Sequence, residues 1–239
     1  MVRHTLKGLP ALIDTEINMR SSDRGAIKAV IKTGTILGAD QRASKAAFRA
    51  ALVSYWNYKN QVLCGVMPFN KEGRTVPPEE RTVPPGSPSG ARMRIAVIGH
   101  SYNVYDTYIS MDLIGKLKKY GADVTTIEMV NKNDINREAS QLSKPMFWNY
   151  GRNAYGAALH LATSGKVDGM ICLTSFGCGI DSFVYDIIER RVRREYKMPF
   201  ITITVDEHSG EAGFNTRLEA FIDMLHWRRI HEDNISASG

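Results

Sequence analysis

The chain has 239 residues, of which 43% are hydrophobic and 23% are charged. These proportions are typical of a folded globular protein and exclude a chain that is disordered throughout. The formal net charge is +6, a balance that favours anionic partners. The densest basic run, 189–197, belongs to a segment with apolar residues at helical spacing. It is therefore interpreted as the solvated face of a helix, and nucleic acid is not an expected partner.

The sequence contains no membrane or export signal that we can identify. No run approaches the roughly 18 apolar residues of a membrane span, and acidic residues interrupt the N-terminal segment where a secretory signal has its apolar core. The three cysteines, Cys64, Cys172 and Cys178, do not make a disulfide framework. We therefore expect a cytoplasmic protein with no membrane partner, whose reduced thiols are able to bind metal.

The first part of the chain, 1–62, is predicted to be a helical region. Apolar side chains recur at three- and four-residue spacing in three segments, 9–19, 25–37 and 40–63, as they do in amphipathic helices. Asp40 is expected to cap the third helix. Nothing in this region forms a catalytic constellation. A segment rich in proline, glycine and serine follows, with RTVPP repeated at 74–78 and 81–85, and predicts an exposed linker over 63–92.

The remainder, 93–239, is predicted to be an α/β domain. Four apolar segments are typical of buried strands, at 93–99, 122–129, 166–175 and 198–206. Amphipathic segments between and after them predict helices at 107–121, 133–142, 150–164, 181–197 and 214–230. This alternation predicts a parallel, Rossmann-like sheet of four or more strands with helices on both faces. Ligands of such sheets bind beyond the carboxyl ends of the strands, which directs attention to three loops.

The first loop, GHSYNVYD (99–106), follows the first predicted strand and precedes a helix. It lacks the glycine pattern of a dinucleotide site and the lysine of a Walker loop. A glycine at this place allows a ligand to approach the backbone, and helix amides favour an anion. His100 is interpreted as a ligand, as a proton donor, or simply as a polar residue at a strand end.

The second loop, TSFGCGID (174–181), places Cys178 between Gly177 and Gly179. Amides of the following helix would stabilise a thiolate there, and a thiolate suits nucleophilic chemistry or iron binding. The glycines favour iron–sulfur chemistry, because a cluster needs close backbone whose amides point at sulfur. A structural cysteine in a tight turn is the alternative. Asp181 is expected to cap the next helix, and Cys172, inside the strand, to be a core residue.

The third loop, VDEHSGEAGF (205–214), is rich in charge and follows the fourth predicted strand. Its adjacent carboxylates, Asp206 and Glu207, point in opposite directions in extended chain. His208 and Glu211 are candidates for acid–base work on a substrate. The alternative is that the loop anchors its neighbours, with Ser209 and Glu211 capping the last helix.

Two of these loops, taken together, resemble a known family. DGMICLTSFGCGIDSF followed by PFITITVDEHSGEAGFNTRLEAFIDML resembles the C-terminal part of the 2-hydroxyacyl-CoA dehydratase D-component superfamily. The similar branch is that of the large fused CoA-substrate-specific enzyme activases. MRIAVIGHSYNVYD resembles the start of the second α/β domain of that branch. The resemblance covers roughly 93–226, and residues 1–62 match the segment that joins the two halves of such proteins only weakly.

The resemblance implies a [4Fe-4S] cluster that serves anaerobic metabolism of an acyl-CoA substrate. In this family an ATP-hydrolysing activase delivers one electron to the cluster. Cys178 stands where the family has a cluster cysteine, which makes it the metal ligand here, with Gly177 and Gly179 as cofactor-binding neighbours. Since a cluster is usually held by about four protein ligands, the isolated chain is expected to bind none. A cysteine-bearing α/β partner domain or subunit would have to complete the set.

Three hypotheses follow. In the first, the chain is a subunit of an electron-activated reductase or dehydratase (a lyase), with His100, His208 and Glu211 as catalytic residues beside the cluster. In the second, it is a docking or regulatory α/β module with no cluster. In the third, Cys178 is the nucleophile of a hydrolase, with His208 or His100 as its general base.

Overall fold

The computed structural model describes residues 12–17, 24–67 and 92–237, without the side chains of 232–237, and the structural statements below refer to these residues. The chain divides into two compact units, Met1–Gln61 and Val62–Gly239, which are described separately. Most of the predicted linker, 63–92, lies outside the described residues. No described helix is both long enough and apolar enough to cross a bilayer.

Among its described residues the first unit has the helix α2 (Arg24–Ile36) and all but the last two residues of α3 (Gln41–Leu63). The predicted cap of α3 is confirmed, because the backbone N–H of Ala43 donates to Asp40 Oδ1 at 2.7 Å. The helix predicted at 9–19 is wrong over residues 12–17, which are not helical. There the hydroxyl of Thr15 lies 2.9 Å from that of Thr33 on α2, so a side-chain contact ties this segment to α2. The rest of 9–19 lies outside the described residues.

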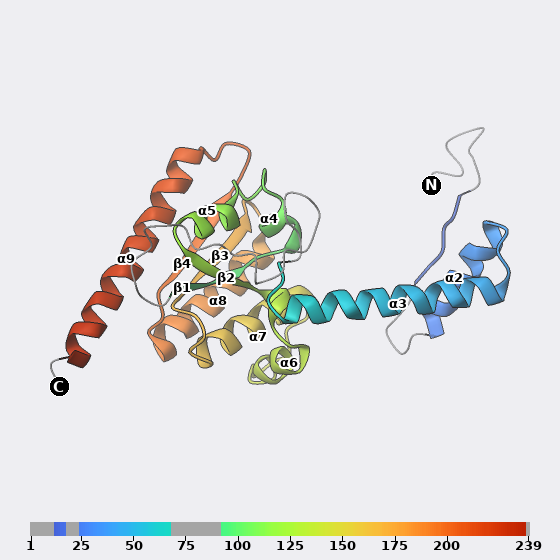
Figure 1. Ribbon diagram of the computed structural model, residues 1–239, viewed down its shortest axis with the longest axis horizontal. Helices are drawn as coiled ribbons and strands as arrows, with labels where there is room; N and C mark the ends of the chain where they lie inside the picture. The colour runs from blue at the N-terminus through green and yellow to red at the C-terminus, as the bar shows by residue number, and fades with distance from the viewer. Residues whose placement is uncertain (1–11, 18–23, 68–91, 238–239) are drawn as a thin grey trace. The chain divides into compact units, whose positions relative to one another are not determined.

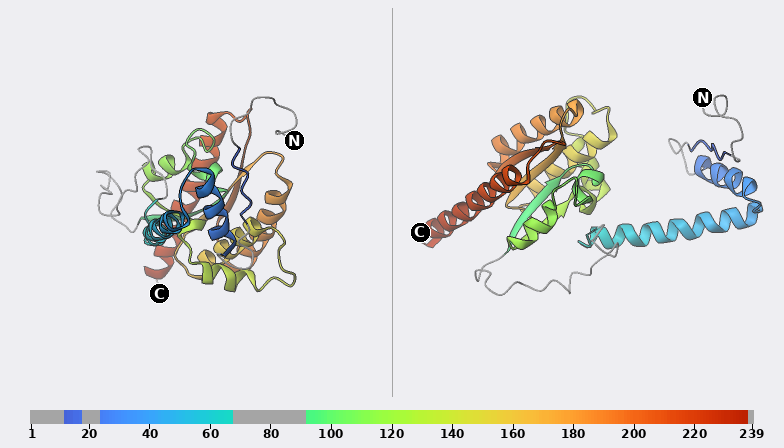
Figure 2. Two further views of the ribbon diagram at one scale, coloured as in Figure 1. Left: turned by 90° about the vertical axis from the view of Figure 1, so that its right-hand side faces the viewer. Right: turned by 90° about the horizontal axis from the view of Figure 1, so that it is seen from above.

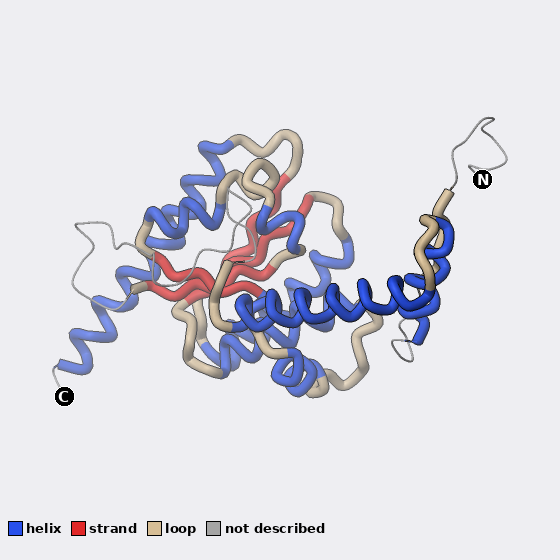
Figure 3. Tube along the Cα trace, turned by 45° about the vertical axis from the view of Figure 1, so that its right-hand side comes forward, coloured by secondary structure: helices blue, strands red, loops and turns tan. Residues whose placement is uncertain are grey.

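The second unit is built on one sheet, which confirms the predicted α/β fold (Figure 3). Its strands are β1 (Met93–Ile98), β2 (Ala122–Thr126), β3 (Gly169–Ser175) and β4 (Phe200–Val205). All pairs are parallel, and the strand order is β2-β1-β3-β4. The carboxyl ends of the strands therefore share one edge of the sheet.

Helices connect the strands in the expected alternation. They are α4 (Ser101–Tyr105), α5 (Leu113–Lys119), the short 3₁₀ helix η2 (Ile127–Met129), α6 (Lys132–Ala139), α7 (Asn149–Thr163), α8 (Gly179–Tyr196) and α9 (Glu211–Ala237). The single helix predicted at 107–121 is wrong in its first half. The Asp106 carboxylate accepts from the backbone N–H groups of Tyr108 and Ile109 at 2.9 and 3.0 Å. Met111 and Asp112 have left-handed φ angles of 50° and 56°, so α5 begins only after them.

Side chains of successive strand residues enter two separate hydrophobic cores, one on each face of the sheet. In β3, Met170 and Cys172 pack with residues of α6, α7 and α8, whereas Ile171 and Leu173 pack with residues of α5 and α9. Figures 1 and 2 show the sheet between these two sets of helices. A parallel sheet needs both faces covered in this way, and the cover leaves the sheet's ends as the places where loops meet solvent.

An ion-pair cluster ties the strands at the opposite, amino-terminal edge. Asp168 accepts from the Arg94 backbone N–H and from its guanidinium, both at 2.7 Å, and Arg229 of α9 donates at 3.3 Å. Burial raises the pKa of Asp168, but the hydrogen bonds from Arg94 outweigh it, so the pKa lies below its usual value. An ionised Asp168 therefore joins β1, the segment before β3, and α9.

The close packing of α6 against α7 depends on Gly156, which gives a first prediction. A Cβ added there would lie 2.2 Å from the Ile135 carbonyl oxygen, and backbone cannot move aside as a flexible side chain can. We expect Gly156→Ala to lower the free energy of unfolding by about 2–3 kcal/mol, measured by urea unfolding.

The matched control is Gly213→Ala on α9, where an added Cβ meets nothing within 4 Å. It should leave stability unchanged or raise it by about 0.5 kcal/mol, because alanine is the better helix former. Equal stability of the Gly156→Ala protein and the wild type would contradict the α6–α7 contact.

Candidate functional site at the carboxyl edge of the sheet

The strand order reverses between β1 and β3, and we call the place where the loops after these two strands diverge the crevice. From β1 the chain crosses to the outer strand β2, while β3 continues to β4 on the other side. Where the strand order reverses in this way, the loops after the two central strands diverge, and ligands of such folds bind between them. Ile98 and Cys172 are register partners, so the segments that carry His100 and Cys178 leave neighbouring strands at the same edge.

Cys178 begins α8 as its N-cap residue, at the carboxyl edge, and it is half-buried. A left-handed Gly177, with φ of +78°, turns the chain, and the Cys178 N–H donates to the Ser175 carbonyl at 3.2 Å. The prediction that Asp181 caps this helix is wrong. Asp181 is the third residue of α8, and its carboxylate is bound elsewhere.

That carboxylate lies beside His100. His100 Nε2 is 3.2 Å from Asp181 Oδ1, and only 1% of the Asp181 side chain is exposed. Because a carboxylate only accepts, the imidazole donates from Nε2. The second carboxylate oxygen, Oδ2, has no hydrogen-bond partner among the described protein atoms. Asp181 therefore orients His100 and keeps one acceptor for another donor, such as water or a ligand.

The ring of His100 is held by aromatic stacking. It lies almost parallel to Tyr150, with 3.4 Å between ring centroids, and 5.2 Å from the ring of Tyr102. The Tyr150 hydroxyl is 2.8 Å from that of Tyr185, which donates to the Leu173 carbonyl at 3.5 Å. Burial raises the pKa of Tyr150 and of Tyr185, so both phenols stay neutral and link the His100 stack to the end of β3.

A second contact crosses the crevice between Ser175 and Asn103. Ser175 Oγ donates to Asn103 Oδ1 at 3.1 Å, and the Asn103 side chain is fully buried. Its Nδ2 has no hydrogen-bond partner within the described part of the chain. Buried polar groups in folded proteins are normally hydrogen-bonded. The crevice thus presents one unpartnered donor, on Asn103, and one unpartnered acceptor, on Asp181.

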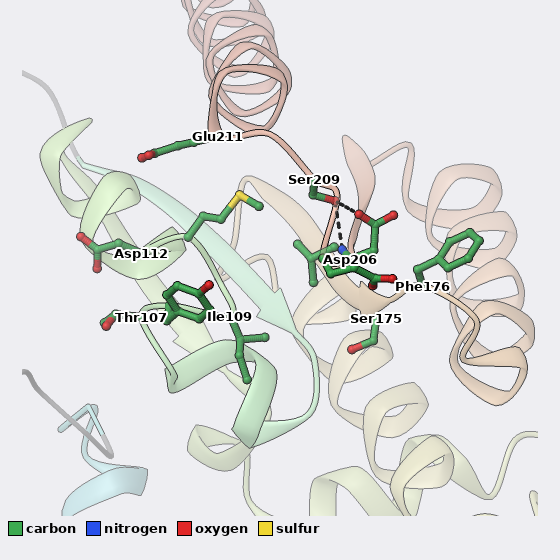
Figure 4. Close-up of a pocket in the computed structure, with 12 residues that line it drawn as sticks. Thr107, Ile109, Asp112, Ser175, Phe176, Asp206, Ser209 and Glu211 are labelled. Atoms are coloured by element: carbon green, nitrogen blue, oxygen red, sulfur yellow. Dashed lines mark hydrogen bonds between the residues drawn. The ribbon is translucent and has the colours of Figure 1, made fainter.

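A pocket of about 610 Å³ opens beside the crevice, towards β4. Three segments line it: 107–112 after α4, Ser175 and Phe176 after β3, and 205–211 after β4. Figure 4 shows the labelled side chains of these segments around the pocket. Of the three residues predicted to be catalytic, Glu211 lines this pocket, whereas His100 and His208 are not among its lining residues.

The loop after β4 is held by its own hydrogen bonds. Ser209 Oγ donates to Asp206 Oδ1 at 2.9 Å and lies 2.9 Å from the Asp206 backbone nitrogen, whose N–H donates to it (Figure 4). Asp206 Oδ1 also accepts from the His208 backbone N–H at 2.8 Å. The hydrogen bond from Ser209 lowers the pKa of Asp206. Glu211 accepts from Lys116 Nζ at 2.7 Å, which lowers its pKa too. The His208 side chain is 87% exposed. These contacts favour the anchoring interpretation of the loop over acid–base work.

The described residues do not by themselves supply the ligands of a metal cluster. No three His, Cys, Asp or Glu side chains within them lie close enough together to hold a metal ion. Cys172 is fully buried in β3, as predicted, and burial raises its pKa well above the usual value. Cys64 is exposed at the end of α3. Of the three cysteines, Cys178 is the one that lies at the carboxyl edge of the sheet.

Sequence patterns did not identify several residues of the crevice. Asn103 and Ser175 lie in the first and second loops singled out by the sequence, but no role was predicted for either, and Tyr150 looks like an ordinary helix residue. The one usable signal was position, because Asn103 lies in the loop after one predicted strand and Ser175 ends another. Glu128 was also missed: it accepts from Ser101 at 2.6 Å and from Tyr105 at 2.8 Å, and so fixes α4 against the end of β2.

Two family models match the chain. The model of the CoA enzyme activase uncharacterised domain (DUF2229) matches residues 1–130, which is more than half of the chain. The model of the 2-hydroxyglutaryl-CoA dehydratase D-component matches residues 122–225. The second match includes Cys178, Asp181 and the loop after β4. No curated protein matches the chain.

The turn before Cys178 gives a second prediction. A side chain at Gly177 would adopt the left-handed conformation at a cost of about 1–2 kcal/mol, although an added Cβ meets nothing within 4 Å. We expect Gly177→Ala to lower the free energy of unfolding by that amount in urea titrations. Gly179 is equally open but has no positive φ, so Gly179→Ala should change stability by less than about 0.5 kcal/mol. An equal loss in both variants would contradict this assignment of the strain.

The three thiols should differ in reactivity, which is a third prediction. We expect iodoacetamide to modify Cys64 and Cys178 in the folded protein, because neither is buried. Cys172 should react only after unfolding in urea, since it is inaccessible and its raised pKa keeps it a thiol. Peptide mass spectrometry over time measures each site, and Cys64→Ser isolates the signal of Cys178. Modification of Cys172 as fast as that of Cys178 would contradict the buried position of β3.

Proposed function

The chain belongs to the family of the CoA enzyme activase uncharacterised domain (DUF2229), whose model matches residues 1–130, and we propose that it is a component of an iron–sulfur system of the 2-hydroxyacyl-CoA dehydratase and activase type. In this proposal, Cys178 provides one ligand of a [4Fe-4S] cluster. A cysteine-bearing α/β domain or subunit provides the others. The match of the D-component model to residues 122–225 supports the assignment of the α/β unit to this system.

The observation that carries the proposal is the position of Cys178. It is accessible at the N-terminus of an 18-residue helix, beside the crevice between β1 and β3. The first turn of a helix has N–H groups without intrahelical partners, and negative charge is favoured there. The Cys178 sulfur therefore lies beside the N-terminus of this helix and stays available to a partner.

The proposal requires a partner for a chemical reason. Iron–sulfur clusters are usually held by about four protein ligands, mostly thiolates, and the other two cysteines of this chain are not beside Cys178 in sequence or on the same loop. The ATP-hydrolysing activase as electron donor and an acyl-CoA as substrate are parts of the same proposal. The cluster, once bound, would supply single-electron chemistry.

Within this site, we assign acid–base work to His100. Its contact with Asp181 and its stacking on Tyr150 fix the imidazole at the crevice, as a proton donor or acceptor must be fixed. Gly177 and Gly179 allow close approach to the sulfur. Glu211 is ion-paired with Lys116, and we assign it to shaping the pocket. A catalytic role for His208 stays a prediction.

Anaerobic reconstitution with iron and sulfide tests the proposal, as a fourth prediction. The chain alone should acquire no stable cluster. Mixed with a cysteine-bearing α/β protein of the same family, it should show thiolate-to-iron absorbance and about four iron atoms per complex. Cys178→Ser should abolish or severely reduce this iron content, while Cys64→Ser, the control, should retain it.

Complex formation is measured separately, by size-exclusion chromatography. A complex that forms but binds no iron would overturn the proposal and support a docking module without a cluster. Equal iron content in the Cys178→Ser and wild-type complexes would overturn the role of Cys178. Rapid alkylation of Cys178 that is lost in His100→Ala would instead support the nucleophile hypothesis.

A further inference from the structure

Aromatic side chains gather at the carboxyl edge of the sheet. Among the described residues of the second unit, seven large aromatic side chains are exposed, and all but Trp227 belong to loops or helix starts at this edge. Two of them, Tyr108 and Phe147, are 92% and 91% exposed. We name the six the aromatic rim: Tyr102, Tyr108, Phe147, Trp148, Phe176 and Phe183.

Several members of the rim lie close to the candidate site. Tyr108 and Phe176 line the same pocket. Phe176 precedes α8, and Phe183 lies inside its first turns. Tyr102 stacks on His100, which stacks on Tyr150, two residues after Trp148. Members of the rim therefore lie both at the pocket, through Tyr108 and Phe176, and beside His100, through Tyr102.

So much exposed aromatic surface is unusual for a protein surface that contacts only water. Burying one such side chain gains about 1.5–3 kcal/mol, and exposed apolar patches with a polar border mark interaction sites. Aromatic residues are also the side chains that most often dominate the binding energy of protein interfaces. The rim thus has the chemistry of an interface centre.

The border of the rim is negatively charged. Five carboxylates lie at this edge on the side of the pocket, against one exposed lysine, Lys144, on the loop of Phe147: Asp106 and Asp112 on the loop of Tyr108, and Asp206, Glu207 and Glu211 on the loop after β4. The hydrogen bond from Ser209 lowers the pKa of Asp206, and the hydrogen bond from Lys116 lowers the pKa of Glu211. Both carboxylates are therefore ionised at neutral pH. Lys116, which also lies over the ring of Phe214, is tied to Glu211. An acidic border on a chain with net charge +6 is a local departure from the overall charge.

The negative charge around the rim indicates which kind of molecule binds there. Nucleic acids and anionic membranes bind through cationic surfaces, so the carboxylates repel both. A second copy that used the same face would form a two-fold interface with its own acidic border opposite itself. Like charges opposed across an interface disfavour that arrangement. A different protein with a basic border is the occupant that this face fits.

We infer that the aromatic rim is a docking surface for a protein whose face carries arginine or lysine around an apolar centre. Arginine suits the rim because a guanidinium stacks on aromatic rings and binds carboxylates through two hydrogen bonds. The inference rests on the proposed function for the partner's role as the provider of cluster ligands, and it adds the chemistry of the partner's surface.

The test uses the full-length protein without iron and three synthetic peptides of equal length and equal tryptophan and leucine content. The polar residues are arginine and lysine in the first peptide, glutamate in the second and serine in the third. Fluorescence anisotropy should show that the basic peptide binds at least about tenfold more tightly than the serine peptide, and that high salt weakens it. The glutamate peptide should bind least. Equal affinity for the basic and serine peptides would overturn the inference.

Variants locate the binding surface. The double variant Tyr108→Ser/Phe176→Ser should lose about tenfold or more in affinity for the basic peptide. Glu207→Lys should weaken the same peptide and remove part of its salt dependence. Trp227→Ser is the matched control, because Trp227 is 65% exposed on α9 and away from the rim, and it should bind like the wild type. Equal losses in the control and the double variant would overturn the location.

Two further outcomes would replace the inferred occupant. A dimer of the wild type that the Tyr108→Ser/Phe176→Ser variant loses would identify a second copy. Binding to phosphatidylserine vesicles that the same variant loses would identify a membrane surface. Because the assays contain no iron, a failure here leaves the cluster proposal intact. If the complex forms but acquires no cluster in the reconstitution, the cluster proposal fails and the inference of a docking surface stands.

Discussion

The parallel pairing of β1 with β3 is the constraint on which the rest of the second unit depends. It sets Ile98 beside Cys172, so the loops that follow both strands begin at one edge. Parallel strands need crossover helices, and these helices cover both faces of the sheet. The carboxyl edge is therefore where polar side chains from distant parts of the chain meet. The contact of His100 with Asp181 crosses this strand pair, 81 residues apart in sequence.

The strands and most helices were predictable because their signals are local. Runs of apolar residues at strand length, broken by amphipathic segments, indicate a parallel sheet without knowledge of strand order. Two errors show where local signals end. The helix predicted from 107 failed because Asp106 binds the next backbone amides and two residues adopt left-handed φ angles. Asp181 was predicted as a helix cap, but a partner from another loop binds its carboxylate, and that partner depends on strand order.

In the site, too, features with a local sequence signal were predictable, and features that depend on contacts between distant loops were not. Cys178 stands out in the sequence because it lies between glycines at the end of an apolar run, and the fold places it at a helix N-terminus. Cys172 was predictable as a core residue, because strand alternation directs it to one face. By contrast, the roles of Asn103 and Ser175 depend on two loops meeting across the crevice. Side-chain chemistry alone does not distinguish them from other loop residues.

The crevice has buried polar atoms without partners among the described residues, and the aromatic rim has apolar side chains in contact with water. Asn103 and Asp181 have buried polar atoms with no hydrogen-bond partner in the described protein, while the rim holds apolar surface in water. Burial favours aromatic surface and penalises unpaired polar groups, so each arrangement is the reverse of what stability alone selects. A partner docked on the rim would bury the aromatic rings and exclude water from the edge. Exclusion of water strengthens charge interactions, which is the setting that the proposed ligand at Cys178 and the proposed proton donor at His100 would require.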